Sequence, residues 1–300
     1  MFKIQNYTRD PQLQLEGGLI TLTSENIRKM QSIIFSIYKD VLFVCNKYDL
    51  KLILGGGTAL GAIRHAGFIP WDDDMDLIMP RRDFNRFTSF FKHEFPDKYD
   101  LISPDGQRGR IGYTINVIEK NATLISVFDK SRMGHSGISV DITALDFVPK
   151  YGILRFFKGI SADLLLFIIN SRMMFKCRTK YSDRLFFLHT ISFVTYLIRL
   201  FVGFLSCIFS YDYLAKFYDR FVSSERKSKY VTIACGRKHY KGETLCVHTF
   251  FPLKEVLFDG VKSYVPNDVD LYLKNLYGDN YMSIPPENKR EPHACVRLNI

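Results

Sequence analysis

The chain has 300 residues, 47% of them hydrophobic, which is ample for a packed core and allows one large domain or a core with an elaborate insertion. Its formal net charge of +10 and isoelectric point near 9.2 favour anionic partners such as nucleotides, phosphorylated glycans or membrane surfaces. Nucleic acid is disfavoured, because the sequence has no arginine-rich repeat and no recognised nucleic-acid-binding motif. Six cysteines without a CxxC pair argue against a disulfide framework and for a reducing cytoplasm.

The first twenty residues are mixed in character and predict an arm or an edge strand. They contain no apolar region of the kind found in a secretory signal peptide. A helix is then predicted from Thr23 or Ser24, both preferred helix caps, to about Asp49. Its apolar residues recur at helical spacing, which predicts a scaffold helix packed on the core sheet. These residues are Ile27, Met30, Ile34, Ile37, Val41 and Val44.

A glycine-rich turn follows. The apolar residues 52–54 predict a short buried strand, and residues 58–66 predict a helix. Between them stand Gly55, Gly56 and Gly57, which let the backbone turn sharply and approach a ligand closely. A helix N-terminus directly after such a turn is a favourable site for phosphate.

Four carboxylates then occur within five residues, at Asp72, Asp73, Asp74 and Asp76. Like charges this close raise one another's pKa unless a cation neutralises them, and hard metals such as Mg²⁺ favour oxygen ligands. On an extended strand residues i and i+2 share a face, so Asp74 and Asp76 are predicted to project together, as is Asp72 if the strand begins early. The alternative is a solvated acidic turn. Leu77 stands where an EF-hand requires Gly, and no G-K-[ST] of a P-loop follows the glycines.

The next segments are predicted from turn and strand signals. Pro80 is expected at the first position of a helix that turns Phe84, Phe87 and Phe91 to the core. Residues 96–110 are polar and predict a loop. Residues 111–118 and 122–128 read as two strands of a hairpin around Lys120-Asn121. Further on, Asp141 lies inside an apolar run, where a charge is costly unless it is paired or bound to metal.

The stretch GGGTALGAIRHAGFIPWDDDMDLIMPRRDF, residues 55–84, closely resembles the core of the LicD family of phosphotransferases, whose animal relatives include fukutin and the fukutin-related protein. The resemblance extends over residues 51–84, resumes at 140–149 and 258–293, and is weak between 151 and 257. It implies an α/β class, with a nucleotidyltransferase-type core, a mixed β-sheet and a largely helical insertion. It also implies transfer of a phospho-alcohol from a CDP-alcohol to a surface glycan, with phosphocholine and CDP-choline in the best-known members.

The resemblance further implies a metal site. Asp74, Asp76 and Asp141 would hold Mg²⁺ or Mn²⁺, with Asp141 as the third carboxylate on a neighbouring strand. Asp72 would accept a proton from the acceptor hydroxyl or complete the metal shell. Asp146, at the end of the matching D-I-x-x-L-D pattern, is either an outer partner of the site or a cap.

Phosphate contacts are expected from the glycine turn and from several basic residues. The backbone of residues 55–57, with Thr58, would cradle phosphate. Arg64 and His65 would reach the phosphates or orient the acceptor, unless they only neutralise the C-terminal end of their helix. The other candidates are Arg81 and Arg82, which a solvated pair would explain equally well, and Lys289, Arg290 and His293, which would otherwise belong to a disordered tail. Trp71 is a candidate lid.

Residues 151–220 differ in character, being rich in Phe, Leu and Ile and carrying a basic run. The most apolar window, residues 185–210, has the length of a membrane span, but Arg199 near its middle disfavours one. A helical insertion fits better, either as a plain helical subdomain or lying on the membrane surface. In the second case the basic run would attract anionic head groups. Its residues are Arg172, Lys176, Arg178, Lys180 and Arg184.

Cys235, His239, Cys246 and His248 offer soft ligands, and zinc is an open possibility, although their spacing matches no known zinc module. The domains expected are a catalytic core at residues 1–150, a helical, hydrophobic and basic insertion at 151–250, and a C-terminal segment at 251–300 that completes the active site.

The function expected is transfer of phosphocholine, or another phospho-alcohol, from a CDP-alcohol to a hydroxyl of teichoic acid, lipopolysaccharide or capsule. It would take place in the cytoplasm or at the inner face of the cell membrane. Two alternatives stay open: a D-x-D glycosyltransferase that uses a sugar nucleotide, and an inactive membrane-associated assembly protein. Ethanolamine, glycerol and ribitol phosphates remain candidates, because 17 tyrosines and 26 phenylalanines do not define a choline box.

Overall fold

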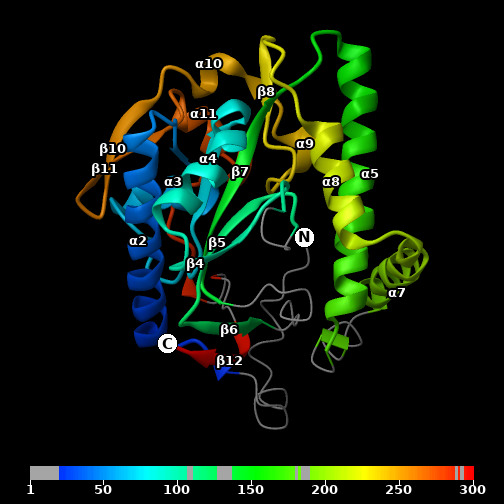
Figure 1. Ribbon diagram of the computed structural model, residues 1–300, viewed down its shortest axis with the longest axis horizontal. Coiled ribbons are helices and arrows are strands. Elements are labelled where there is room, and N and C mark those ends of the chain that lie inside the picture. Colours follow the sequence, from blue (N-terminus) through cyan, green and yellow to red (C-terminus); the bar gives the residue numbers. More distant parts are fainter. Residues whose placement is uncertain are drawn as a thin grey trace.

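The computed structural model describes residues 20–106, 111–126, 137–179, 182–183, 190–287, 290 and 294–300 (Figure 1). The predicted α/β class is confirmed, since helices surround a mixed sheet. The central path of the sheet runs through β2 (Ile53–Leu54), β3 (Asp76–Pro80), β7 (Ser139–Phe147), β5 (Ile115–Glu119) and β4 (Tyr99–Ile102). The pair β3 and β7 is parallel, and the other pairs on this path are antiparallel.

Two helices from the N-terminal half of the chain pack against the sheet. The first, α2 (Ser24–Lys47), begins as predicted, with the Thr23 hydroxyl accepting a hydrogen bond from the Asn26 amide. Its apolar stripe is buried in the main core, and its Tyr38 hydroxyl lies 2.7 Å from that of Ser263. The second, α4 (Arg81–Glu94), buries the predicted phenylalanine stripe. Pro80 is the last residue of β3 and precedes this helix rather than beginning it.

A buried ion pair connects α4 to the rest of the fold. Arg81 is 4% exposed and forms two hydrogen bonds, of 2.8 and 2.7 Å, with the carboxylate of Asp146 on β7. A third bond of 2.8 Å reaches Asp219 on α8 (Tyr211–Val222). The expectation that Arg81 contacts phosphate is therefore wrong, because its donors are already committed to these carboxylates. Asp146 is the partner of an arginine, and it also accepts a hydrogen bond from the Ser224 amide.

Two strand predictions are wrong. The expected loop at 96–110 contains β4, which pairs with β5. The expected hairpin does not form, because β6 (Thr123–Ser126) leaves β5 and pairs with the C-terminal strand β12 (Ala294–Asn299). β12 also pairs with β1 (Ile20–Thr21), so that both ends of the described chain meet in a separate three-stranded sheet (Figure 1).

The helices between β7 and β8 (Tyr230–Thr232) form a layer along one side of the molecule, opposite the hairpin of β10 (Lys254–Phe258) and β11 (Val261–Val265) (Figure 1). Besides α8, this layer contains α5 (Gly152–Cys177), α7 (Thr190–Leu205) and the short η3 (Ser206–Ile208). It has a small core of its own with side chains such as Leu166 and Tyr218. The predicted segment boundaries at residues 150 and 250 stay predictions.

Within the described residues, no single helix has both the length and the apolar character to cross a membrane. The helices at Phe193–Ile208 and Tyr211–Val222 reach these criteria only as a pair, and they are bent by 97° relative to each other.

The C-terminal part returns to the sheet. β8 pairs with β7, and β9 (Leu245–Cys246) pairs with β8. The short helices α9 (His239–Gly242) and α10 (Val247–Phe250) flank this edge. Near residue 270 the chain forms α11 (Val269–Tyr277), whose first turn is capped by the Asp268 carboxylate. α11 packs against α3 (Gly56–His65), so the two ends of the sequence resemblance meet in space.

Candidate active site

The glycine turn is fastened to the acidic strand by the backbone. The Gly55 amide donates to the Asp76 carbonyl oxygen at 3.0 Å, and the Asp76 amide donates to the Thr58 hydroxyl at 2.9 Å. Gly56 has a φ of +44°, and a β-carbon there would lie 2.6 Å from an Asp76 carboxylate oxygen. A β-carbon on Gly57 would lie 2.9 Å from an oxygen of Asp72. Only glycine allows the N-terminus of α3 to approach these carboxylates so closely.

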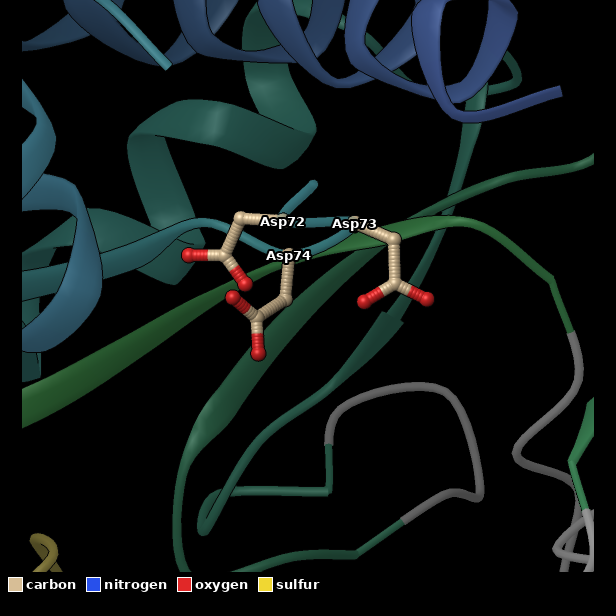
Figure 2. Close-up of side chains that lie close together, drawn as sticks. All are labelled: Asp72, Asp73 and Asp74. Atoms are coloured by element: carbon tan, nitrogen blue, oxygen red, sulfur yellow. The ribbon is translucent and has the colours of Figure 1, made fainter. Parts of the chain in front are cut away.

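Three of the carboxylates come together just before the strand (Figure 2). One oxygen from each of Asp72, Asp73 and Asp74 lies within 4.8 Å of the others. The sequence had predicted Asp74 beside Asp76 on one strand face, but β3 begins only at Asp76. Asp74 therefore lies in the segment before β3, where its carboxylate groups with those of Asp72 and Asp73 while its charge still acts on Asp76. The grouping adds Asp73, which the sequence does not predict as a metal ligand, to the acidic site.

Asp76 and Asp141 form the adjacent part of the acidic site. They are register partners on the parallel strands β3 and β7, so their side chains lie on the same sheet face. Asp141 accepts hydrogen bonds from the Asn116 amide group at 2.6 Å and the Ser139 hydroxyl at 2.9 Å. The pKa of Asp76 is raised well above its ordinary value, mainly by burial and then by the charges of Asp74, Asp141 and other carboxylates.

A cavity of about 620 Å³ opens in front of these groups. One wall consists of the glycine turn with Asp72, Asp74 and Asp76. The opposite wall comes from residues 233–243, from α11 and from residues 280–290. Tyr272 of α11 joins the walls, because its hydroxyl accepts a hydrogen bond of 3.0 Å from the Gly56 amide. The cavity size suits a nucleotide-sized ligand.

The far wall carries an acid that the sequence did not indicate. Glu243 is 2% exposed, lines the cavity and accepts a hydrogen bond of 2.9 Å from the Lys238 amide. Burial raises the pKa of Glu243 to about 7. It lies in the weakly matching part of the chain, far in sequence from the aspartates, and no local pattern distinguishes it from a surface glutamate.

Three arginines give the cavity a cationic side. Arg64 donates to the Tyr281 carbonyl oxygen at 2.9 Å and to His65 at 3.0 Å, and burial lowers the pKa of its guanidinium. The guanidinium of Arg290 lies 4.2 Å from the ring centre of Trp71, which also lines the cavity. Arg237, the third, was not predicted.

Three residues predicted to contact phosphate do not line the cavity. Arg82 is exposed and follows β3 at the end opposite Asp76, about 13 Å along the strand at 3.3 Å per residue. Thr58 is buried and occupied with the backbone of β3. His65 contacts Arg64 and the edge of Trp71 but is not part of the cavity wall. Lys289 and His293 lie outside the described residues.

Among the described residues, the aspartate trio is the group that brings three possible metal ligands within reach of one ion. Cys235, His239, Cys246 and His248 are all among the described residues, and their ligand atoms do not form such a group. The aspartates supply only oxygen donors, and the pKa of Asp76 beside them is raised first by burial and then by the neighbouring carboxylates. This donor set fits Mg²⁺ or Mn²⁺ and does not resemble a zinc site.

Residues 49–142 match the family model described as LicD/FKTN/FKRP, nucleotidyltransferase domain. Over 75 residues the chain is 40% identical to the lipopolysaccharide cholinephosphotransferase LicD of Haemophilus influenzae. This aligned segment covers 25% of this chain and 28% of that protein. Over 152 residues it is 34% identical to the uncharacterized protein RP689 of Rickettsia prowazekii, covering 46% of this chain and 51% of the relative. The chain thus spans about a quarter to a half of the curated relatives it matches.

Proposed function

We propose that this chain, whose residues 49–142 match the LicD family model, is a metal-dependent phosphotransferase. It would move phosphocholine from CDP-choline to a hydroxyl group of a cell-surface glycan, with lipopolysaccharide as the first candidate acceptor, and would release CMP. The observation that carries the proposal is the cavity in which a glycine turn, clustered aspartates and three arginines face one another.

The aspartates would hold the metal ion of this reaction. Asp72, Asp74 and Asp76 face the cavity, while Asp73 and Asp141 adjoin them. When bound, Mg²⁺ or Mn²⁺ supplies positive charge that offsets charge developing on the phosphoryl oxygens.

The remaining groups would position the donor and manage the proton. Arg64, Arg237 and Arg290 would neutralise and orient the phosphates. In the transfer, the acceptor oxygen forms a bond to the phosphorus of phosphocholine, and the bond from that phosphorus to the CMP oxygen breaks. Glu243 would take the acceptor's proton, because a carboxylate with a pKa of about 7 accepts protons effectively near neutral pH.

The test is CMP release by the purified chain with Mg²⁺ and a lipopolysaccharide acceptor, comparing CDP-choline, CDP-ethanolamine, CDP-glycerol and CDP-ribitol. We expect release from CDP-choline and a loss of about a hundredfold or more in Asp76→Asn, which removes a charge beside the transferred phosphate. Asp97→Asn changes an exposed carboxylate outside the cavity and should keep the wild-type rate.

Full turnover in Asp76→Asn would refute the assignment of the aspartates. Release of a nucleoside diphosphate from a sugar nucleotide, without CMP release, would assign the cavity to a glycosyltransferase instead.

A further inference from the structure

The helical layer of α5, α7, η3 and α8 exposes an unusual amount of apolar surface. Among the described residues, 23 large hydrophobic side chains are exposed, and 17 of them lie between residues 151 and 217. A soluble surface carries scattered apolar residues, but a concentration of this kind marks an interaction site. Ile208 is 82% exposed, Ile153 is 74% exposed and Phe201 is 63% exposed.

These side chains follow the helices in ordered stripes. On α5, Ile153, Phe157, Ile160 and Leu164 recur at three- and four-residue spacing and share one face. On α8 and just before it, the rings of Phe209, Tyr213, Phe217 and Phe221 stack in succession, with centroids 5.5, 6.2 and 6.4 Å apart. The stripes belong to one layer, because the Lys158 ammonium of α5 reaches the Val222 carbonyl oxygen of α8 at 3.2 Å.

α7 contributes to the same layer. The Arg199 guanidinium lies 4.6 Å from the ring centre of Phe167 on α5, and Phe204 lies 6.0 Å from Phe175. Arg199 thus stays at the contact between the helices, while the neighbouring apolar side chains of α7 face outward. They are Val194, Leu197, Ile198, Phe201, Phe204 and Leu205.

The net charge of this segment favours an anionic partner. Residues 151–222 contain ten basic and four acidic side chains. The segment therefore carries a large share of the chain's net positive charge of +10. Two copies docking through this layer would bring like charge against like charge. An anionic lipid surface complements both the apolar stripes and the basic excess.

A small cavity beside the α5 stripe supplies a place for a head group. It measures about 370 Å³ and is lined by Arg155, Phe156, Tyr230 and Lys241, among others. The Nη1 atom of Arg155 is buried and, within the described part of the chain, has no hydrogen-bond partner. Its guanidinium lies 4.2 Å from the centre of the Tyr230 ring. A lipid phosphate between Arg155 and Lys241 would satisfy this donor.

We propose that the layer of α5, α7, η3 and α8 docks the protein on an anionic membrane surface, with the apolar stripes in the interface and a lipid phosphate between Arg155 and Lys241. The helices lie on the membrane rather than across it, because no described helix has both the length and the apolar character of a span. The docking does not depend on the phosphotransferase reaction, so the two proposals fail separately.

The test is flotation of the full chain with vesicles of phosphatidylglycerol and phosphatidylcholine in equal parts, and with vesicles of phosphatidylcholine alone. We expect strong binding to the anionic vesicles and weak binding to the neutral ones. Ile153→Glu with Phe157→Glu should reduce the partition about tenfold or more, because charged side chains oppose insertion. The matched control, Leu257→Glu with Leu271→Glu, makes the same change at exposed residues outside the layer and should bind like wild type.

Two further variants sharpen the result. Phe201→Glu with Ile208→Glu should repeat the loss from a different helix, and circular dichroism verifies that each variant is folded. Arg155→Gln with Lys241→Gln should reduce the preference for anionic over neutral vesicles. Absent vesicle binding by wild type, or equal binding by the layer variants and the control, would overturn the proposal. So would a dimer in solution that the Ile153→Glu, Phe157→Glu variant dissociates, since it would assign the layer to a second copy.

Discussion

The buried acid Glu243 is expected to make the stability of the fold depend on pH. Its pKa is raised by burial from 4.5 to about 7 in the folded chain. Between these values the folded protein keeps a proton that the unfolded chain has lost, so the free energy of unfolding falls as pH rises. The shift corresponds to roughly 3 kcal/mol at about 1.4 kcal/mol per pH unit.

Glu243→Gln should therefore flatten the dependence of stability on pH, because glutamine can still accept the hydrogen bond from Lys238 but cannot ionise. Urea unfolding at pH 5 and pH 8 measures the difference between variant and wild type. We expect the variant to gain stability relative to wild type at pH 8. The exposed Glu225→Gln serves as the control. If the free energy of unfolding depends on pH in the same way in wild type and in Glu243→Gln, Glu243 does not titrate in this range.

Some residues of the site could be predicted from the sequence and others could not. Gly55–Gly57 and the aspartates lie within about twenty residues, so a local pattern was enough to predict a phosphate and metal site there. Glu243, Arg237 and Tyr272 reach the cavity only through the tertiary fold. Even inside the motif, the grouping of Asp73 with Asp72 and Asp74 depends on where β3 begins, which residue spacing does not determine.

At the scale of elements, Arg81 connects α4 to β7 and α8 through one guanidinium group. Its removal would leave the Asp146 carboxylate, 1% exposed, without its counter-charge. We expect Arg81→Met to lower the free energy of unfolding by about 3–5 kcal/mol. Arg82→Met, at an exposed neighbouring position, should change it by less than about 0.5 kcal/mol. The urea midpoints of the two variants give the comparison, and equal midpoints would contradict the role of the buried pair.

Element pairing was the least predictable part of the fold. Residues 111–118 and 122–128 have the alternation and the turn of a hairpin, yet β6 pairs with β12, whose residues come more than 160 positions later. Strand propensity is local, whereas the choice of partner depends on what the far end of the chain provides. Helices were easier, since the stripe of α2 and the cap at Thr23 are encoded within the element.

At the scale of the whole molecule, we predict that the aspartate cluster makes stability depend on divalent cations. A ligand that binds the folded chain stabilises it by about 2.7 kcal/mol at a hundredfold excess over its Kd. Adding Mg²⁺ should therefore raise Tm by several degrees, as measured by calorimetry with and without EDTA.

The double variant Asp72→Asn with Asp74→Asn should lose this increment. It should also be more stable than wild type in EDTA, because two of the mutually repelling charges of the cluster are removed. A Tm increment that survives in the double variant would show that Mg²⁺ binds elsewhere.

The two walls of the cavity also appear at different times as the chain is made. The glycine turn and the aspartates leave the ribosome first, and residues 233–290 follow only after the whole helical layer has been synthesised. At about 5–20 residues per second, this interval lasts on the order of ten to thirty seconds. During this interval the glycine turn and the aspartates have been synthesised, but Arg237, Glu243, Tyr272 and Arg290 have not. We therefore expect that a nascent chain can gather cations at its aspartates before it can enclose a nucleotide, because the second wall requires residues 233–290.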